Sequence, residues 1–320
     1  DHLGTITSSG SSPAGFPKAS AGHPPLIQLN PRLFVRETPM TPDLLIKYDR
    51  LRSILRELGG VVIGYSGGVD STFLLKASVD ELGDRALAVI GRSETYPTRE
   101  YEEAVRIALE IGARFEEVRT EETDNLKFRE NPADRCYFCK TELFSKLNAI
   151  AEARGIPWIA DGTIVDDLGD FRPGMKAKSE QSVRSPLLES GMSKADVREL
   201  SRELGLPTWN KGSFACLSSR FPYGFAITRE ALRKVDDSET VFRDLGFREF
   251  RVRHHDEKTA RIEVGAGELP RLFDEQVRAT VVSHLKKLGF AYITLDLQGY
   301  RTGSMNEVLH GAAPAGKVPS

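Results

Sequence analysis

The sequence of 320 residues contains only three cysteines, an odd number that is too small for a disulfide scaffold. We therefore expect a reducing, cytoplasmic compartment. No stretch approaches the roughly 18–20 consecutive apolar residues of a membrane span, so we expect no membrane partner. Neither sign of charge dominates, because 44 Lys and Arg against 46 Asp and Glu leave a net charge of −2. That balance argues against a protein whose main task is to coat nucleic acid.

Apolar periodicity is missing from residues 1–42, which hold seven of the 17 prolines. We expect a disordered or loosely packed extension there, and it lacks the apolar core of a secretory signal. The remaining length suits two domains. The sequence predicts an α/β domain over residues 43–222, a smaller α+β domain for substrate binding or oligomerisation over 223–304, and a frayed tail over 305–320.

Between residues 43 and 222, apolar runs typical of buried strands alternate with stretches of helical periodicity. The expected strands are 61–65, 85–90, 114–119 and 158–161, and the expected helices are 44–58, 72–82, 98–111, 140–154 and 193–204. Ser193 and Asp196 have the spacing of a capping box. Such alternation predicts a doubly wound parallel sheet with helices on both faces. Beyond residue 224, we expect helices over 228–245 and 268–288 and strands over 249–253, 261–264 and 292–295.

A glycine-rich loop, Ser66-Gly67-Gly68-Val69-Asp70-Ser71, stands between a predicted strand and a predicted helix. Two glycines let the backbone turn sharply and approach an anion closely, and the first amides of the helix point at that anion. Ser66 and Ser71 add hydroxyl donors, and Asp70 can hold the Mg²⁺ that accompanies a polyphosphate. The lysine of the GxxxxGK[ST] loop is missing. The loop instead resembles the SGGxDS pyrophosphate loop of N-type ATP pyrophosphatases, and the alternative is an ordinary Gly-rich turn between a strand and a helix.

Three further positions complete the predicted ATP site. Gly64 ends the strand before the loop, and Ser93 lies just past the second strand. Gly162 follows the strand over 158–161, at the carboxyl edge where ligands bind in open α/β sheets.

The cysteines form one CxxC pair, Cys136 and Cys139, and a separate Cys216. A Cys₄ zinc site is excluded by number, and all six histidines lie far from these segments in sequence. A redox pair would not explain Cys216. Three thiolates and an open fourth position suit a [4Fe–4S] cluster whose unique iron binds an exogenous ligand. The alternative is three unrelated buried cysteines.

Together these segments resemble one family, the ATP-dependent sulfur transferases of the LarE type, which help to make the nickel-pincer nucleotide cofactor of lactate racemase. The resemblance covers residues 43–300. It is carried by the loop at 66–71, by Gly162-Thr163 and the stretch over 166–174, by Arg184-Ser185-Pro186-Leu187, and above all by Ala215-Cys216-Leu217-Ser218-Ser219-Arg220-Phe221-Pro222-Tyr223-Gly224.

The resemblance implies that a carboxylate of a pyridinium dicarboxylate mononucleotide attacks the α-phosphate of ATP, and that a sulfur nucleophile then displaces AMP. It implies that Asp70 and Cys216 are catalytic. It also implies either a [4Fe–4S] cluster on all three cysteines or a Cys216 that gives up its own sulfur, and we favour the cluster. Arg220, Glu239, Arg251 and Arg253 are the expected substrate-binding residues, the last two alternating along one strand. We also expect a homo-oligomer.

Three rival functions remain. A tRNA thiolase shares the loop and the cysteines, but residues 220–301 hold 15 Lys and Arg against 13 Asp and Glu, which gives no basic surface for tRNA. An ammonia-dependent amide synthetase would not need Cys216. A nucleotide sensor with a structural metal site would release no pyrophosphate.

Overall fold

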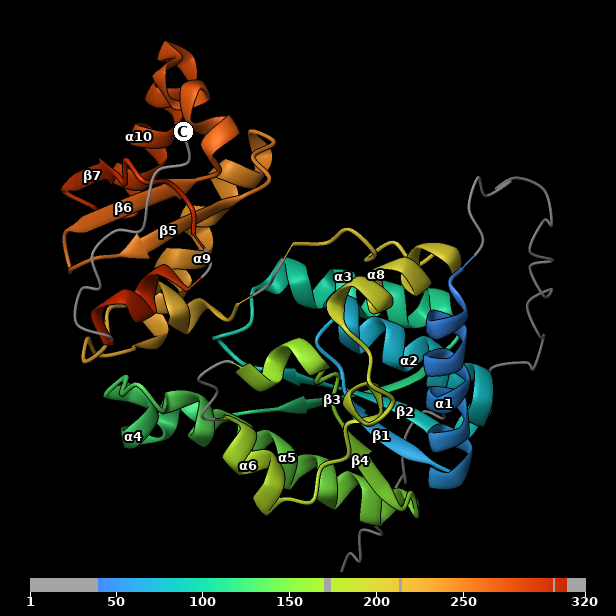
Figure 1. Ribbon diagram of the computed structural model, residues 1–320. Helices are drawn as coiled ribbons and strands as arrows, with labels where there is room; N and C mark the ends of the chain where they lie inside the picture. The colour runs from blue at the N-terminus through green and yellow to red at the C-terminus, as the bar shows by residue number, and fades with distance from the viewer. Residues whose placement is uncertain (1–39, 170–173, 213–214, 302, 310–320) are drawn as a thin grey trace, which may run out of the picture. The chain divides into compact units, whose positions relative to one another are not determined.

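The computed structural model describes residues 40–169, 174–212, 215–301 and 303–309 (Figure 1). Outside the described residues lie most of the N-terminal segment predicted to be loosely packed and most of the predicted frayed tail. Positions 170–173 of the motif over 166–174, and positions 213–214 just before the motif that begins at Ala215, also lie outside them. The elements from the first helix to the last strand belong to one unit that begins at Thr41. No described helix has the length and apolar character that a membrane span requires.

Four parallel strands form the larger sheet in the order β3-β2-β1-β4. They are β1 (Val61–Gly64), β2 (Ala86–Arg92), β3 (Arg114–Arg119) and β4 (Trp158–Ala160). The longer helices around them are α1 (Pro42–Leu58), α2 (Val69–Leu82), α3 (Thr98–Ile111), α5 (Arg135–Arg154), α6 (Gly174–Glu180) and α8 (Lys194–Glu203). Helices α5 and α6 lie on one face of the sheet and α2, α3 and α8 on the other (Figure 1). The predicted doubly wound α/β fold is therefore confirmed.

Short helical segments connect these elements. They are η1 (Gly83–Arg85), η2 (Glu122–Asp124), α4 (Leu126–Arg129), η3 (Val165–Gly169), α7 (Pro186–Glu189) and η4 (Leu217–Arg220). The core under α5 joins Phe144 and Leu147 of that helix to Val62 and Leu87 of the sheet. Because β1 is buried on both faces, it consists of apolar residues up to Gly64 rather than of alternating ones.

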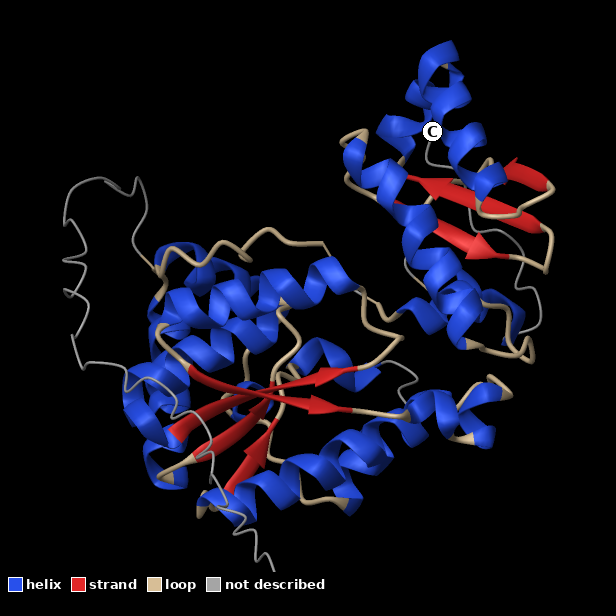
Figure 2. Ribbon diagram, turned by 180° about the vertical axis from the view of Figure 1, so that it is seen from behind, coloured by secondary structure: helices blue, strands red, loops and turns tan. Residues whose placement is uncertain are grey.

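The smaller sheet has the strand order β5-β6-β7, with an antiparallel first pair and a parallel second pair. Its elements are α9 (Arg229–Asp244), β5 (Phe250–His254), β6 (Thr259–Val264), η5 (Ala266–Phe273), α10 (Glu275–Lys287), β7 (Tyr292–Leu295) and η6 (Ser304–Leu309). Phe242 of α9 and Leu285 of α10 pack with Val252 and Ile262 of the strands in one apolar core. Figure 2 shows the strands of this smaller sheet beside its helices. The predicted α+β unit is confirmed, and the domain limits at 222 and 304 stay a prediction.

Several predicted boundaries were wrong. The helix expected over 268–288 is two helices, because Pro270 lies in η5 and the carboxylate of Asp274 caps a new start for α10. Helix α1 begins at Pro42, capped by Thr41, and not at Leu44, since proline suits the first helical turn. Helix α5 begins at Arg135 rather than at residue 140, so the CxxC pair lies inside its first turns.

Candidate active site

The pyrophosphate loop has the backbone geometry that its glycines predicted. Gly67 has a φ of +63°, and a Cβ there would lie 2.6 Å from the Cβ of Ala104 in α3. Gly68 is the N-cap of α2 and has no side chain to bond the first amides of the helix. The hydroxyl of Tyr96 donates to the carbonyl of Ser66 at 2.9 Å. The loop is thus held from outside, and the start of α2 keeps its positive end for an anion.

Hydroxyl groups and one carboxylate line this helix start. The Oγ atoms of Ser66 and Ser71 are hydrogen-bonded at 3.1 Å. Asp70 lies in the first turn, where its two carboxylate oxygens accept from Nζ of Lys194 at 2.7 and 2.5 Å. Burial raises the pKa of Asp70, and the ammonium of Lys194 acts in the opposite direction. The carboxylate proposed for Mg²⁺ therefore already holds a cation.

Gly162 lies directly against the loop. A Cβ at Gly162 would lie 3.0 Å from the amide nitrogen of Ser71, a tight contact with the backbone that favours glycine there. A Cβ at Gly64 would lie 3.3 Å from Cδ2 of Leu147 in α5. The preceding carboxylate, Asp161, accepts from the hydroxyls of Thr163 at 2.7 Å and Ser185 at 2.6 Å. The carboxyl ends of β1 and β4 thus meet at the loop, as predicted.

Ser93 leads to a residue that the sequence reading missed. Its hydroxyl donates to Oε1 of Glu122 at 2.6 Å, and the hydroxyl of Thr95 donates to the same oxygen at 2.7 Å. Glu122 is only 2% exposed, and the described residues offer no hydrogen-bond partner to its Oε2. The thiol of Cys139 lies 4.0 Å from Oε1. Glu122 thus connects Ser93 of the predicted ATP site to Cys139 of the CxxC pair.

All three cysteines are free thiols. Burial raises the pKa of Cys136 and of Cys139, and the negative charge of a Cys216 thiolate raises both further. The three sulfur atoms are therefore within electrostatic range of one another. Within the described ranges, however, no three His, Cys, Asp or Glu side chains are arranged so as to hold a metal ion.

The CxxC segment and the Cys216 segment are tied together by Asn131. This residue has a φ of +53°, is fully buried, and donates from its side-chain amide to the carbonyl of Pro222 at 2.7 Å. Its own carbonyl accepts from the amide of Gly224. The guanidinium of Arg135 lies 4.9 Å from the ring centroid of Tyr223. The Pro-Tyr-Gly sequence over 222–224 thus joins the two cysteine-containing segments through these contacts.

Arg220 holds the Cys216 segment from the inside. One nitrogen, Nη1, donates to the carbonyls of Ala215 at 2.6 Å and Cys216 at 3.1 Å. The Nε and Nη2 atoms each donate to a carboxylate oxygen of Glu239 at 2.9 Å. Arg220 and Glu239 are 2% and 1% exposed. These two predicted substrate-binding residues are therefore hydrogen-bonded to each other, and Arg220 is also hydrogen-bonded to the main chain of Cys216.

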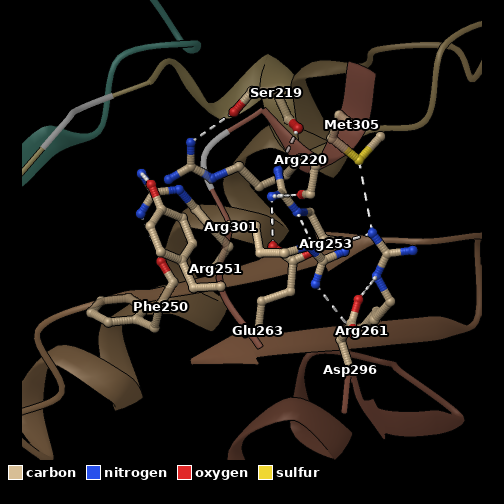
Figure 3. A network of polar contacts seen from close by, with 12 residues as sticks. Ser219, Arg220, Phe250, Arg251, Arg253, Arg261, Glu263, Asp296, Arg301 and Met305 are labelled. Atoms are coloured by element: carbon tan, nitrogen blue, oxygen red, sulfur yellow. Dashed lines mark hydrogen bonds and ion pairs between the residues drawn. The ribbon is translucent and has the colours of Figure 1, made fainter. Parts of the chain in front are cut away.

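Arg251 and Arg253 belong to the same network of polar contacts (Figure 3). Arg253 forms a two-bond ion pair with Glu263, at 2.9 and 2.6 Å, and donates to the carbonyl of Ser219 at 2.9 Å. Arg251 donates to the carbonyl of Phe250 and lies 4.9 Å from the ring centroid of Tyr300. Burial lowers the pKa of Arg251, and the nearby positive charge of Arg220 lowers it further. The network therefore has a positive potential that an anion would relieve.

Comparison with known proteins identifies the family. A family model described as NAD synthase matches residues 47–156. An uncharacterised protein of Synechocystis sp. is 43% identical over 263 residues, which are 82% of this chain and 98% of the relative. The pyridinium-3,5-bisthiocarboxylic acid mononucleotide synthase of Lactiplantibacillus plantarum is 39% identical over 269 residues, 83% of this chain and 96% of the synthase. The chain belongs to the family of this synthase. An uncharacterised protein of Methanocaldococcus jannaschii is 28% identical over 76% of the chain and 91% of its own length.

Membership in the synthase family confirms the resemblance carried by the cysteine-containing motif. Sequence reasoning nevertheless missed three polar residues of the site, Glu122, Lys194 and Lys211. The ammonium of Lys211 lies 2.7 Å from the carboxylates of both Glu100 and Glu103 and 3.4 Å from the carbonyl of Gly67. Each reaches the site from a segment distant in sequence and without a motif of its own, so no local pattern marks it.

Proposed function

We propose that this member of the synthase family is an ATP-dependent sulfur transferase acting on a pyridinium dicarboxylate mononucleotide. A substrate carboxylate oxygen attacks the α-phosphorus of ATP, and pyrophosphate leaves with the electrons of the broken P–O bond. A sulfur nucleophile then attacks the acyl carbon, and AMP leaves with the oxygen. The product is a thiocarboxylate.

One contact carries the proposal. The amide of Leu217, the residue after Cys216, donates to the carbonyl of Thr95 at 2.8 Å. Thr95 is two residues from Ser93 and shares its acceptor, Glu122, with it. A nucleotide bound at the loop and Ser93 would therefore be activated beside the cysteines. Sulfur transfer needs that proximity, because an acyl-adenylate that waits in water hydrolyses.

The positive network of Figure 3 supports a nucleotide substrate. Arg251 is the side chain there that we propose binds the substrate phosphate, because burial and Arg220 make its charge costly in the ligand-free chain. Arg253 and Arg220 are each engaged by a buried carboxylate, Glu263 and Glu239. We propose that these two pairs position the segment over 215–220 and the strand β5 around the phosphate, and contribute their charge rather than free donors.

Two groups absent from the structure are part of the proposal. Asp70 would hold Mg²⁺ together with the phosphates of ATP, since magnesium commonly takes one or two carboxylates and completes its shell with phosphate and water. Cys136, Cys139 and Cys216 would hold a [4Fe–4S] cluster. Their chemistry fits, because all three are free thiols. Burial and the nearby Cys216 raise the pKa of Cys136 and of Cys139, and bonding of these thiolates to iron would relieve that cost. Such a cluster would supply a site for exogenous sulfide, the sulfur donor.

The rival with most in common is an amide synthetase, because the matching family model is that of NAD synthase. Ammonia-dependent chemistry does not require Cys216. In the structure the residues around Cys216 are held by two hydrogen bonds from the Arg220 guanidinium to the carbonyls of Ala215 and Cys216, and by one from the Leu217 amide to the carbonyl of Thr95. We further propose that the protein works in the cytoplasm as a homo-oligomer.

The test is a single assay with two readouts on anaerobically purified protein. ATP, the dicarboxylate mononucleotide and sulfide should yield one AMP for each thiocarboxylate formed, detected by mass. Replacing sulfide by ammonia should yield no amide. Amide formation, or AMP release that continues unchanged in Cys216→Ser, would contradict the proposal.

A further inference from the structure

Three ammonium groups surround a pyrophosphate loop whose sequence contains no lysine. Lys194, at the start of α8, contacts Asp70. Lys211 contacts the carbonyl of Gly67. Lys178, in α6, lies 3.4 Å from Asp161, next to Gly162. An anion with the charge of ATP needs cations at this position, and the fold brings them from elements far along the chain.

The three lysines differ in what holds them. Lys211 is shared between Glu100 and Glu103, whose hydrogen bonds raise its pKa against the effect of burial. Lys178 is buried against Asp161. Lys194 is bonded to the carboxylate of Asp70, which is also the group expected to bind Mg²⁺. A metal ion that arrives with ATP would therefore displace Lys194 and leave the other two in place.

The main chain at Lys194 is fixed, but its side chain is not enclosed. Its amide donates to a carboxylate oxygen of Asp166 at 2.8 Å. The preceding Ser193 forms a capping box with Asp196, so the start of α8 is pinned. The Lys194 side chain is 38% exposed. A long flexible side chain on a fixed helix end can change partners by rotation alone.

We propose that Lys194 exchanges partners during the reaction, neutralising Asp70 in the nucleotide-free chain and contacting the β- and γ-phosphates once Mg²⁺ and ATP are bound. This inference rests on the proposed adenylation. When the bond between the α-phosphorus and the bridging oxygen breaks, the electron pair stays on the pyrophosphate. The ammonium of Lys194 then stabilises that charge, with no proton transferred. Lys194 thus takes the role of the lysine that is missing from the loop.

The matched pair of variants is Lys194→Gln and Lys47→Gln. Lys47 also pairs with a carboxylate of this helix, Asp196 at 3.0 Å, but it belongs to α1 and its second partner is Asp43 of α1 rather than Asp70. Two quantities are measured on the full chain. The first is Mn²⁺ binding by EPR without nucleotide, where Lys194 competes with the metal for Asp70, and the second is ATP–pyrophosphate exchange with the dicarboxylate mononucleotide. Melting temperatures establish that both variants fold, and Lys194→Arg tests whether charge alone restores exchange.

We expect opposite changes in Lys194→Gln. Mn²⁺ should bind several-fold more tightly, because the competing ammonium is gone. Exchange turnover should fall about ten- to hundredfold, the loss of one charge-assisted contact to phosphate. Lys194→Arg should recover part of it, and Lys47→Gln should match wild type in both. Unchanged or weaker Mn²⁺ binding in Lys194→Gln, or full exchange, would overturn the inference. Absence of exchange in wild-type protein would instead overturn the proposed function, while the Mn²⁺ comparison would still test Lys194.

Discussion

The guanidinium of Arg220 and the carboxylate of Glu239 meet in two parallel hydrogen bonds of 2.9 Å each, with almost no solvent access to either side chain. Burying two charges is costly, and a pair of this geometry offsets the cost only while both members are present. Glu239 also accepts from the amide of Val252 in β5. The pair therefore joins the Cys216 segment to α9 and the smaller sheet.

Removing one member of this pair should be severely destabilising. We expect Arg220→Met to lower the free energy of unfolding by about 3–5 kcal/mol, because Glu239 would be left buried without its main partner. The double variant Arg220→Met with Glu239→Leu should recover much of that loss. Urea unfolding of the single and double variants measures both. A double variant no more stable than the single one would contradict this account of the pair.

The same pair predicts an acid limit to stability. Burial, the largest influence, raises the pKa of Glu239, but Arg220 and two further arginines outweigh it and hold the pKa below its ordinary value. Because the folded pKa is lower than the unfolded value of about 4.3, this stabilisation is complete above that value and is lost as pH falls through the folded pKa. The difference in unfolding free energy between wild type and the double variant should be constant from neutral pH to about pH 5. Below about pH 4 wild type should lose stability relative to the double variant, because Glu239 becomes protonated. Urea unfolding across this range tests it.

Asp70→Asn should abolish ATP–pyrophosphate exchange while leaving the fold intact. It removes the carboxylate expected to bind Mg²⁺ and creates no cavity. Asp80→Asn is the matched control, since Asp80 lies near the other end of the same helix in an exposed pair with Lys76. ATP–pyrophosphate exchange at the wild-type rate in Asp70→Asn would contradict the proposal that Asp70 binds Mg²⁺ in the ATP site.

The two strand arginines should now behave differently from each other. Arg251→Ala should weaken binding of the mononucleotide about ten- to hundredfold with little effect on the melting temperature. Arg253→Ala should lower the melting temperature as well, because it breaks the buried pair with Glu263. Titration calorimetry and thermal unfolding separate the two effects. Equal melting temperatures for both variants would contradict the distinction.

The cysteines distinguish the two sulfur donors. If all three hold a cluster, replacing any one with alanine should abolish the brown chromophore and sulfur transfer together, because two ligands leave two unprotected irons. If Cys216 gives up its own sulfur, Cys136→Ala and Cys139→Ala should each allow one turnover. The intact mass should then fall by roughly 34 Da as Cys216 becomes dehydroalanine. We expect the first result.

What the sequence predicted well was local. The capping box is confirmed because two residues three positions apart, Ser193 and Asp196, determine it. The loop around Gly67 and Gly68 is confirmed because its backbone geometry depends on its own glycines. The start of α5 was missed because its aromatic and cysteine residues give little helical periodicity, while Asp134 and the loop before it set the helix start.

Partnerships across the fold could not be predicted in this way. The sequence predicted both Arg220 and Glu239 as substrate-binding residues, but their pairing across 19 residues depends on how α9 packs. Lys194 and Asp70 are hydrogen-bonded although 124 residues separate them, and no pattern in either segment predicts this pairing. A sequence shows which charged residues are present, whereas the tertiary structure determines which of them pair.

The side-chain bond from Asn131 to Pro222, across 91 residues, also constrains the order of events during synthesis. The CxxC pair is synthesised well before Cys216. Its segment can be joined to the Cys216 segment only after Gly224 is made, because the amide of Gly224 donates to the carbonyl of Asn131. A nascent chain that ends before Cys216 therefore lacks the third thiol, and one that ends before Gly224 lacks the hydrogen bond that joins the two segments. If the three cysteines hold a cluster, as we propose, iron loading would therefore follow the synthesis of the segment that ends at Gly224.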